Sequence, residues 1–381
     1  MKFLHTSDWH LGMTFRGGIS YREDQEYVIS RICDIAVEEK VDGILLAGDV
    51  FDKSIASQEA LKVYDSVMTH ICGRLRIPVY MVAGNHDGAE RISQCSELLK
   101  KSGLYIAGAL EKEAQVVNLG EVDIYLLPWI STDKVKGIYP EEAEKIETME
   151  DAYRVVLDKY REHFVQGRKN LLVAHAYTAD AETSTSDRAA EVGHATMVGA
   201  GVFEGFDYVA LGHLHGPQQV RENIRYSGTP MAYSFGKEES QSKSVTIIDT
   251  DKMEQRIIPV PQLRGRTTLK GTYAELMTND YADEILEGYV RLEVTDCYVG
   301  LDTMASLRER FARLLEVTGK DLERDDGRIT MTIDELEEAE TDPGFIFCRY
   351  CKDILGEEPR EHLMALFDKA IESFEKGAVE E

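Results

Sequence analysis

The chain of 381 residues lacks an uninterrupted apolar run long enough to span a bilayer, which argues against a transmembrane helix. Its first residues enter a strand-like pattern directly and show no apolar segment typical of a signal peptide. Only six cysteines occur. Cys33, Cys72 and Cys95 fall in helical patterns, where reduced thiols pack as small hydrophobic side chains. We therefore predict a reducing, cytoplasmic location.

Cysteine pairs are also scarce. Cys348 and Cys351 form one CxxC pair, and no second pair stands at a spacing suited to zinc. A structural zinc site or a redox site is therefore not predicted there.

Basic residues are few: 43 Lys and Arg stand against 69 Asp and Glu, which gives a formal net charge of −26. Such a chain should not attract nucleic acid through its overall charge. If its substrate is DNA, bound cations, a local basic patch or a partner protein must supply the attraction. With 43% hydrophobic residues the chain is globular, and its length allows two domains with a large core.

Apolar patterns in the first part of the chain alternate between strand and helix periods. Strands are predicted over 2–7, 41–47 and 77–83, with helices from residue 22, from residue 57 and over 89–101. This alternation favours an α/β fold with an open sheet and helices on both faces. The pattern then turns strand-rich over 104–128, a charged loop is predicted over 131–150, and a helix over 149–165. Strands over 171–175, 207–211 and 244–249 complete a domain of residues 1–260, with a long polar loop over 176–200.

The chain changes character near Pro259-Val260-Pro261, where a domain boundary is predicted. A small α+β domain of residues 261–340 follows, with strands over 266–270, 289–295 and 328–333 and helices over 272–278 and 302–317. Residues 341–381 form a helical segment whose apolar stripe is Leu363, Phe367, Ala370, Ile371 and Phe374. This stripe either packs on the chain's own core or binds a partner; we predict partner binding.

Polar motifs follow five predicted strands. They are Asp8-Trp9-His10, Gly48-Asp49-Val50-Phe51-Asp52, Gly84-Asn85-His86-Asp87, His175, and Gly212-His213-Leu214-His215. Ligands gather at the carboxyl ends of parallel strands, and residues two apart in extended backbone point the same way. Carboxylate, imidazole and amide oxygen together suit divalent ions such as Mn²⁺, Fe²⁺ or Zn²⁺. Each motif alone could be a helix cap, a turn or a buried histidine, but five in this order favour a metal centre.

This ordered set resembles the calcineurin-like metallophosphoesterase superfamily over about residues 1–250. Within it, five segments resemble the SbcD family of nuclease subunits. These are Thr6-Ser7-Asp8-Trp9-His10-Leu11-Gly12, Ala47-Gly48-Asp49-Val50-Phe51-Asp52, Ala83-Gly84-Asn85-His86-Asp87, Asp207 through His215, and Arg225-Tyr226-Ser227-Gly228-Thr229-Pro230. The resemblance implies a β-sandwich flanked by helices, a small α+β capping domain and C-terminal helices.

The resemblance also implies residue roles. One metal would be held by Asp8, His10, Asp49 and His215, and a second by Asp49, Asn85, His175 and His213. His86 would stabilise the transition state or protonate the departing oxygen. Asp52 would orient His86, or Asp87 could do so instead. The cofactor would be two divalent ions, with Mn²⁺ expected.

The implied activity is metal-dependent cleavage of DNA, as a 3′-to-5′ exonuclease on duplex ends and an endonuclease on single strands and hairpins. The implied context is DNA repair, recombination and replication, with an SbcC-like ATPase subunit that binds near the C-terminus. A homodimer through the helices near 57–72 and 89–101 would complete a heterotetramer. Two alternatives stay open: a metallophosphatase or phosphodiesterase on small substrates, and a metal-free scaffold. Lys53-Ser54 stands where Ser/Thr phosphatases of this superfamily carry Arg-Gly, which disfavours that group.

Overall fold

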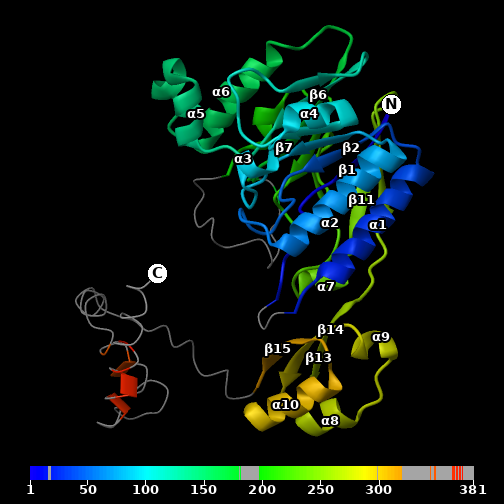
Figure 1. Ribbon diagram of the computed structural model, residues 1–381, viewed down its shortest axis with the longest axis vertical. Helices are drawn as coiled ribbons and strands as arrows, with labels where there is room; N and C mark the ends of the chain where they lie inside the picture. The colour runs from blue at the N-terminus through cyan, green and yellow to red at the C-terminus, as the bar shows by residue number, and fades with distance from the viewer. Residues whose placement is uncertain are drawn as a thin grey trace. The chain divides into compact units, whose positions relative to one another are not determined.

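The computed structural model describes residues 1–15, 19–179, 181, 197–297 and 299–319, and a few residues between 344 and 371. The chain divides into two compact units, residues 1–320 and 321–381. The first unit contains two six-stranded sheets and one three-stranded sheet (Figure 1).

The first six-stranded sheet has four parallel strands and an antiparallel edge. Its strand order is β12-β11-β1-β2-β3-β4. Strands β1 to β4 run parallel, and β11 and β12 pair antiparallel at one side. The bounds are β1 Lys2–Thr6, β2 Gly43–Ala47, β3 Val79–Val82, β4 Leu104–Ala107, β11 Ser244–Asp249 and β12 Glu254–Pro259. All five residues of β2 are buried, as expected for a central parallel strand.

The second sheet repeats this plan with the order β5-β6-β7-β8-β10-β9. Strands β6, β7, β8 and β10 run parallel, and β5 and β9 are antiparallel edges. The bounds are β5 Val116–Asn118, β6 Val122–Leu127, β7 Lys169–His175, β8 Tyr208–Gly212, β9 Gln218–Arg221 and β10 Ile224–Tyr226.

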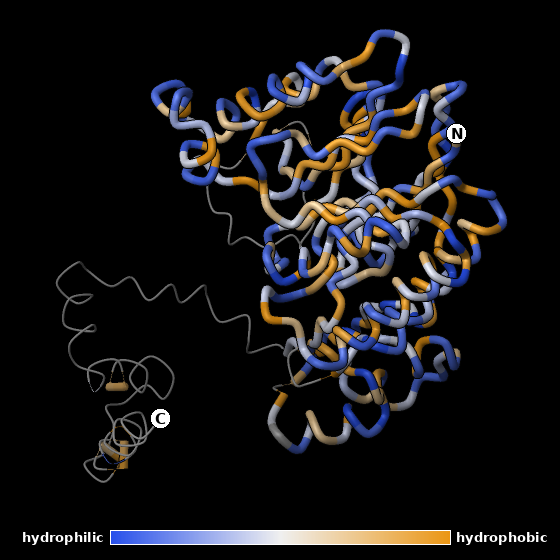
Figure 2. Tube along the Cα trace, turned by 45° about the horizontal axis from the view of Figure 1, so that its top comes forward, coloured by the Kyte–Doolittle hydropathy of each residue, from blue (hydrophilic) through white to orange (hydrophobic). Residues whose placement is uncertain are grey.

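Three apolar clusters define the layers. One joins the facing sides of the two sheets, with Leu45 and Tyr80 from the first and Leu171 and Tyr208 from the second. A second packs the first sheet on helices α1 (Arg22–Glu38) and α2 (Gln58–Met68), and a third packs the second sheet on α5 (Thr132–Ile138) and α6 (Met149–Arg161). Figure 2 shows many hydrophobic segments running through the interior of the trace, while many of its outer turns are hydrophilic. The β-sandwich flanked by helices is confirmed, and the single open sheet expected from the alternation is wrong, because pairing between distant strands is not encoded in local periodicity.

The small domain lies within the first unit and has a core of its own. Strands β13 (Arg266–Gly271), β14 (Tyr289–Val294) and β15 (Leu314–Thr318) form a parallel sheet. Helices α8 (Tyr273–Thr278), α9 (Asp283–Leu286) and α10 (Leu301–Arg310) accompany it, and Leu276, Leu292 and Phe311 are among its buried residues. The limits at 260, 261 and 340 remain predictions.

Three local expectations differ from the structure, and one short helix was missed. The helix predicted over 302–317 ends at Arg310, and Leu314–Thr318 forms β15, because its backbone pairs in parallel with the edge of β14. The helix predicted over 89–101 is broken into α3 (Ala89–Ile92) and α4 (Ser96–Leu99) at Cys95, whose φ is 58°. The loop predicted over 131–150 contains α5, capped by the Ser131 hydroxyl. The short helix α7 (Lys237–Ser240) was not predicted.

Several expectations fall outside the described residues: the strand over 328–333, most of the loop 176–200, Cys351, and Ala370 and Phe374 of the stripe. Among the described residues of the C-terminal unit, the rings of Phe347 and Phe367 stack with centroids 4.2 Å apart. Cys348 Sγ lies 3.6 Å from Met364 Sδ. Part of the predicted stripe therefore packs within this segment. In the part of the chain that the structure describes, no helix has the length and apolarity to cross a membrane.

Candidate metal centre

The predicted ligands stand on loops that leave the carboxyl ends of the central strands. The backbone amides of Asp8 and His10, after β1, donate to the carbonyls of Gly48 and Asp49, after β2, at 3.0 and 2.9 Å. The amide of His213, after β8, donates to Asp8 Oδ1 at 2.9 Å and so joins the second sheet to the first. The carboxyl ends of both sheets therefore meet at one place.

Four of these residues have a backbone conformation that is rare outside glycine. The φ angles are 53° at Asp8, 45° at His10, 47° at Asp49 and 110° at His213. Such conformations cost of the order of 1–3 kcal/mol each and persist where the surrounding structure requires them, most often at functional sites. Four of the eight non-glycine residues with positive φ in the described ranges therefore lie among the predicted ligands, which makes this loop cluster the candidate site.

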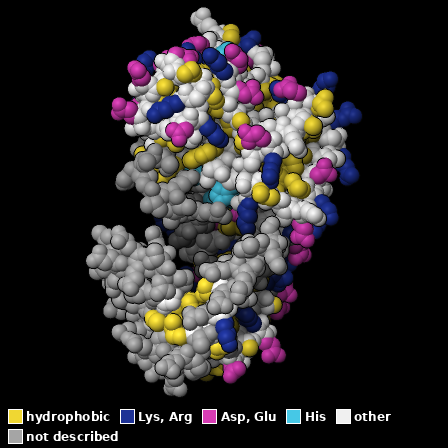
Figure 3. Space-filling view, turned by 60° about the vertical axis from the view of Figure 1, so that its left-hand side comes forward, with side chains coloured by type: hydrophobic (Ala, Val, Ile, Leu, Met, Phe, Trp, Pro, Cys, Tyr) yellow, Lys and Arg dark blue, Asp and Glu magenta, His cyan; other side chains and the backbone are white. Residues whose placement is uncertain are grey.

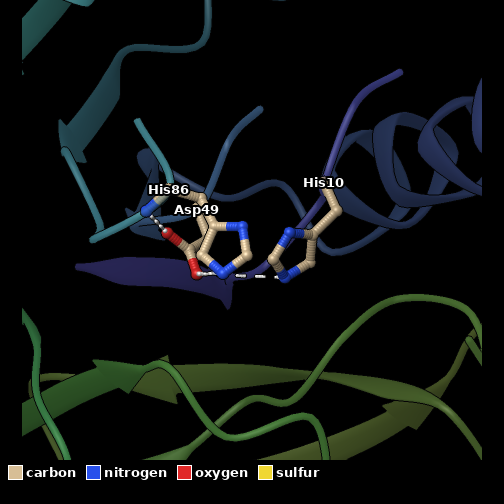
Figure 4. Close-up of side chains that lie close together, drawn as sticks. All are labelled: His10, Asp49 and His86. Atoms are coloured by element: carbon tan, nitrogen blue, oxygen red, sulfur yellow. Dashed lines mark hydrogen bonds and ion pairs between the residues drawn. The ribbon is translucent and has the colours of Figure 1, made fainter. Parts of the chain in front are cut away.

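Asp49 occupies the centre of the cluster. Its Oδ2 atom lies 3.9 Å from His10 Nε2, 4.0 Å from His86 Nε2 and 3.4 Å from His175 Nε2. Figure 4 shows the His10 and His86 rings directed toward the same Asp49 oxygen, while Asp49 Oδ1 accepts a hydrogen bond from the His86 backbone amide. Asp49 is buried and can face both halves of the site.

Two imidazole pairs flank Asp49. His10 Nε2 and His215 Nε2 are 3.1 Å apart on one side. On the other side His175 Nε2 and His213 Nδ1 are 3.3 Å apart, and Asn85 Oδ1 lies 2.9 and 3.2 Å from these two nitrogens. Ring nitrogens that converge in this way can direct lone pairs at one cation.

Hydrogen bonding fixes which nitrogen of His175 is available. Its Nδ1 lies 2.9 Å from the carbonyl oxygen of Ala47, which can only accept, so Nδ1 carries the proton. Nε2 is thereby left to face Asp49 and Asn85 as a ligand atom. Metal-bound histidines commonly have this arrangement, with the distal N–H held by a carbonyl or carboxylate.

The site carries buried charge that a cation would stabilise. Burial, reinforced by Asp49, raises the pKa of Asp8 to about 8 despite the nearby His175. Burial would lower the pKa of His175, but Asp49 and Asp8 raise it to about 9. Burial would likewise raise the pKa of Asp49, but His175 and then His10 hold it well below its usual range. Asp49 and His175 thus each favour the charged form of the other, and a bound divalent ion would compete with the His175 proton.

The donor set fits two divalent ions. Asp8, Asp49 and His175 offer ligand atoms within 4.8 Å of one another, and so do His10, Asp49 and His86. All donors are carboxylate, imidazole or amide groups, which suit Mn²⁺, Fe²⁺ or Zn²⁺. The second group includes His86, so geometry alone does not separate a ligand from a proton donor at this residue.

The expected partner of His86 differs in the structure. His86 Nδ1 donates to the backbone carbonyl of Asp52, at 2.8 Å, rather than to its carboxylate. The carboxylate Oδ1 of Asp52 instead lies 4.0 Å from His10 Nδ1. The Asp87 carboxylate accepts from the amides of Val50, Phe51 and Gly84, so it ties two loops together. Asp52 thus positions His86 through its main chain, which no side-chain pattern could indicate.

Sequence reasoning missed Trp129. Its indole stacks on His213, with ring centroids 5.4 Å apart and 19° between planes, and meets His175 edge-on at 5.9 Å. Its amide donates to the Ala83 carbonyl at 2.9 Å, which joins the ends of β6 and β3. A signal was available, because Trp129 follows a predicted strand just as the other motifs do.

Comparison with known proteins agrees with this fold and geometry. The family model described as calcineurin-like phosphoesterase matches residues 1–217, more than half of the chain. The chain belongs to the calcineurin-like phosphoesterase family.

Within this family, the chain is similar to proteins named as nuclease subunits. The SbcD subunit of the nuclease SbcCD from Staphylococcus epidermidis is 30% identical over 322 residues, which cover 84% of this chain and 85% of the relative. The protein of the same name from Staphylococcus saprophyticus is 29% identical over 384 residues, covering 100% of this chain and 99% of the relative. The similarity to these nuclease subunits therefore extends beyond the matched phosphoesterase region.

Proposed function

We propose that this chain is an SbcD-like nuclease subunit that hydrolyses phosphodiester bonds in DNA at a centre of two divalent metal ions. The observation that supports it most is the Asp49 carboxylate between two converging imidazole pairs. When bound, two metal ions would clamp the phosphodiester and lower the pKa of an attacking water.

The proposed metal ligands are those that the family resemblance implies. Asp8, His10, Asp49 and His215 hold one ion, and Asp49, Asn85, His175 and His213 hold the other. Asn85 is exposed and His213 is half-buried, so the residues that would hold the second ion are more open to solvent than the buried His10 and His215. We propose Mn²⁺ as the native metal, which elemental analysis of protein purified without added metal would test.

His86 is proposed as the proton donor to the departing oxygen. Its Nδ1 donates to the Asp52 carbonyl and its Nε2 lies 4.0 Å from Asp49 Oδ2, so its ring faces the proposed metal centre. A positioned imidazole of this kind contributes roughly 10²–10⁴ in rate.

The expected result for His86→Ala is loss of DNA cleavage by about 10²–10⁴ with both metals retained. Cleavage of a DNA hairpin in Mn²⁺ and elemental analysis measure the two quantities. His163→Ala, at an exposed histidine outside the motifs, is the matched control and should cleave normally. Loss of a metal ion from His86→Ala would make His86 a ligand and contradict this role.

The alternative of a small-substrate phosphatase is tested with the same protein. Hydrolysis of p-nitrophenyl phosphate esters without cleavage of hairpin or single-stranded DNA would favour that alternative. The scaffold alternative would require that the purified chain bind no divalent ion.

DNA binding by this acidic chain is proposed to depend on a partner. On the face shown in Figure 3, Lys and Arg side chains are interspersed with Asp and Glu among the coloured residues and do not form one basic patch. An SbcC-like ATPase would supply the missing attraction. Co-purification of the two proteins, and weaker salt dependence of DNA binding by the isolated chain, are the expected results.

A homodimer through the helices near 57–72 and 89–101 completes the proposed assembly. Large apolar side chains stand exposed on or next to them: Ile55 just before α2 at 70%, Leu61 on α2 at 49% and Leu98 on α4 at 65%. Their exposure is what an interface between copies would cover. Sedimentation equilibrium that returned a monomer at micromolar concentration would contradict the dimer.

A further inference from the structure

The first turn of α1 joins the small domain to the loop that carries His10. We define this segment, residues 21–25, as the coupling turn. Asp24 and Gln25 are both buried, at 3% and 2% exposure, although both are polar. Successive residues of a helix point about 100° apart, so these two neighbours face different parts of the protein.

Gln25 faces the His10 loop. Its Nε2 lies 2.7 Å from the His10 carbonyl oxygen, 3.3 Å from that of Trp9 and 3.0 Å from the Tyr233 hydroxyl. Its Oε1 accepts from the Gly12 amide at 3.2 Å. One side chain thus holds the backbone on both sides of the strained His10, whose φ of 45° needs such support.

Tyr233 supports the same loop from the opposite direction. Its hydroxyl donates to the Trp9 carbonyl at 2.6 Å and accepts from Gln25. Its ring meets His10 edge-on at 5.8 Å and His215 at 6.2 Å. Tyr233 is therefore packed against the imidazole pair on one side of Asp49.

Asp24 faces the small domain. Its Oδ2 accepts from Arg264 Nη1 at 2.6 Å and from the Tyr289 hydroxyl at 2.8 Å. Arg264 precedes β13, and Tyr289 begins β14. A buried carboxylate with two such donors holds its helix turn firmly, because charge-assisted hydrogen bonds are the strong ones.

Arg266 of β13 ties the small domain to the same turn and to Tyr233. It donates to the Tyr21 hydroxyl at 2.8 Å and to the carbonyl of Ala232, the residue before Tyr233, also at 2.8 Å. Its guanidinium lies 5.2 Å from the Tyr21 ring centre and 5.1 Å from that of Tyr289. An unbroken series of hydrogen bonds and ring contacts therefore links the small domain to the His10 loop.

We propose that Gln25 and Tyr233 are positioning residues for the metal site that contains His10 and His215, and that the small domain sets their position through Asp24 and Arg266. This inference rests on the proposed metal centre. It assigns the small domain a role in metal affinity on one side of Asp49 only, because the contacts of Gln25 and Tyr233 described above all reach the His10 side.

The test is a Mn²⁺ titration without substrate. The paramagnetic resonance signal of free Mn²⁺ is measured at each addition, and the titration curve yields the two binding constants. With Trp9 replaced by Phe in every variant, Trp129 is the one tryptophan of the sequence, and its stacking on His213 lets its fluorescence report binding on the His175 side. Gln25→Met keeps the side-chain volume and removes the hydrogen bonds. It should weaken the His10-side ion about 10- to 100-fold, the usual effect of losing a residue that orients a ligand, and leave the other constant unchanged.

Tyr289→Phe removes a single group, the hydroxyl that donates to Asp24. This hydroxyl does not touch His10 and can affect it only through intervening residues. It should weaken the same ion about 2- to 10-fold, the equivalent of one hydrogen bond. The control is Lys270→Met, which removes an exposed ion pair with Glu293 in the same domain and should change neither constant. If Gln25→Met fails to fold, Gln25→Glu takes its place. It keeps the shape of the glutamine side chain and puts an acceptor oxygen where the Nε2 donor stood, and its two Mn²⁺ binding constants are compared in the same way.

Selective weakening by both variants supports the inference. Equal weakening at both sites, or unchanged constants in Tyr289→Phe, overturns it. Failure of the proposed nuclease function is distinguishable: wild-type protein that binds two ions but leaves DNA intact would refute DNA cleavage while the titration still decides the coupling.

Discussion

At the scale of single residues, the site depends on close approach between loops. Gly84 lies against Asp49, and a Cβ atom at residue 84 would overlap Asp49 Oδ1 and its amide nitrogen. Gly48, with φ of +84°, likewise lies against the His175 ring. Side chains at either position would push the central carboxylate or an imidazole out of place, so packing requires both glycines, and Gly48 is required by its positive φ as well.

The shared carboxylate leads to a prediction for Asp49→Asn. Asparagine tolerates the left-handed φ of 47° and keeps an oxygen that can accept from the His86 amide, so folding should change little. Loss of the charge should weaken both metal ions together. Calorimetric titration with Mn²⁺ measures this, with Asp133→Asn, at an exposed position of α5, as the control. Two ions bound at full affinity would rule out a bridging role for Asp49.

At the scale of elements, buried polar contacts lock the strand-end loops to each other. The Asp87 carboxylate, after β3, accepts from the amides of Val50 and Phe51, after β2, at 3.2 and 2.9 Å, and from Gly84 at 2.9 Å. Buried backbone amides need such acceptors, because each one left unpaired costs about 1–3 kcal/mol. The relative position of two ligand loops therefore depends on one side chain that binds no metal in the proposed scheme.

Asp87→Asn should lower the free energy of unfolding by about 1–3 kcal/mol, because the amide group would oppose a backbone N–H where an oxygen now accepts. Urea denaturation monitored by circular dichroism measures it. Glu97→Gln, which removes an exposed ion pair with Lys100, should change the free energy by less than about 0.5 kcal/mol. Equal effects of the two substitutions would show that the Asp87 contacts do not matter to stability.

At the scale of the whole molecule, the first unit contains the folded sheets, and partner binding is proposed for the second unit. Residues 1–320 contain the three sheets and every proposed metal ligand. The described part of the C-terminal unit makes internal contacts between Phe347 and Phe367, yet Leu366 is 60% exposed. A helical segment with an exposed apolar side chain suits a groove on another protein.

A chain ending at residue 320 should therefore fold, bind two Mn²⁺ ions and cleave short single strands. It should lose co-purification with an SbcC-like ATPase. Thermal denaturation and metal titration of the truncated protein, beside the full chain, are the measurements. A melting temperature many degrees lower would instead mean that residues 321–381 complete the core of the first unit.

Local patterns in the amino-acid sequence were enough to locate the strand endings and to indicate the family. Periodicity places β1, β2, β3, β7 and β8 within a few residues of their bounds, because burial of a central parallel strand requires a continuous apolar run. Parallel strands bring their carboxyl ends to one edge, so the polar residues after each could be grouped before any distance was known.

Other features arise only when the chain folds. These features join residues that are far apart in the chain. They are the facing of the two sheets, the third strand Leu314–Thr318, the stacking of Trp129 on His213, and the support of His10 by Gln25 and Tyr233. His86 is held by a main-chain carbonyl, and main-chain atoms are the same in every residue. Local patterns record which residues are buried, whereas their partners across the core are selected only when the whole chain packs.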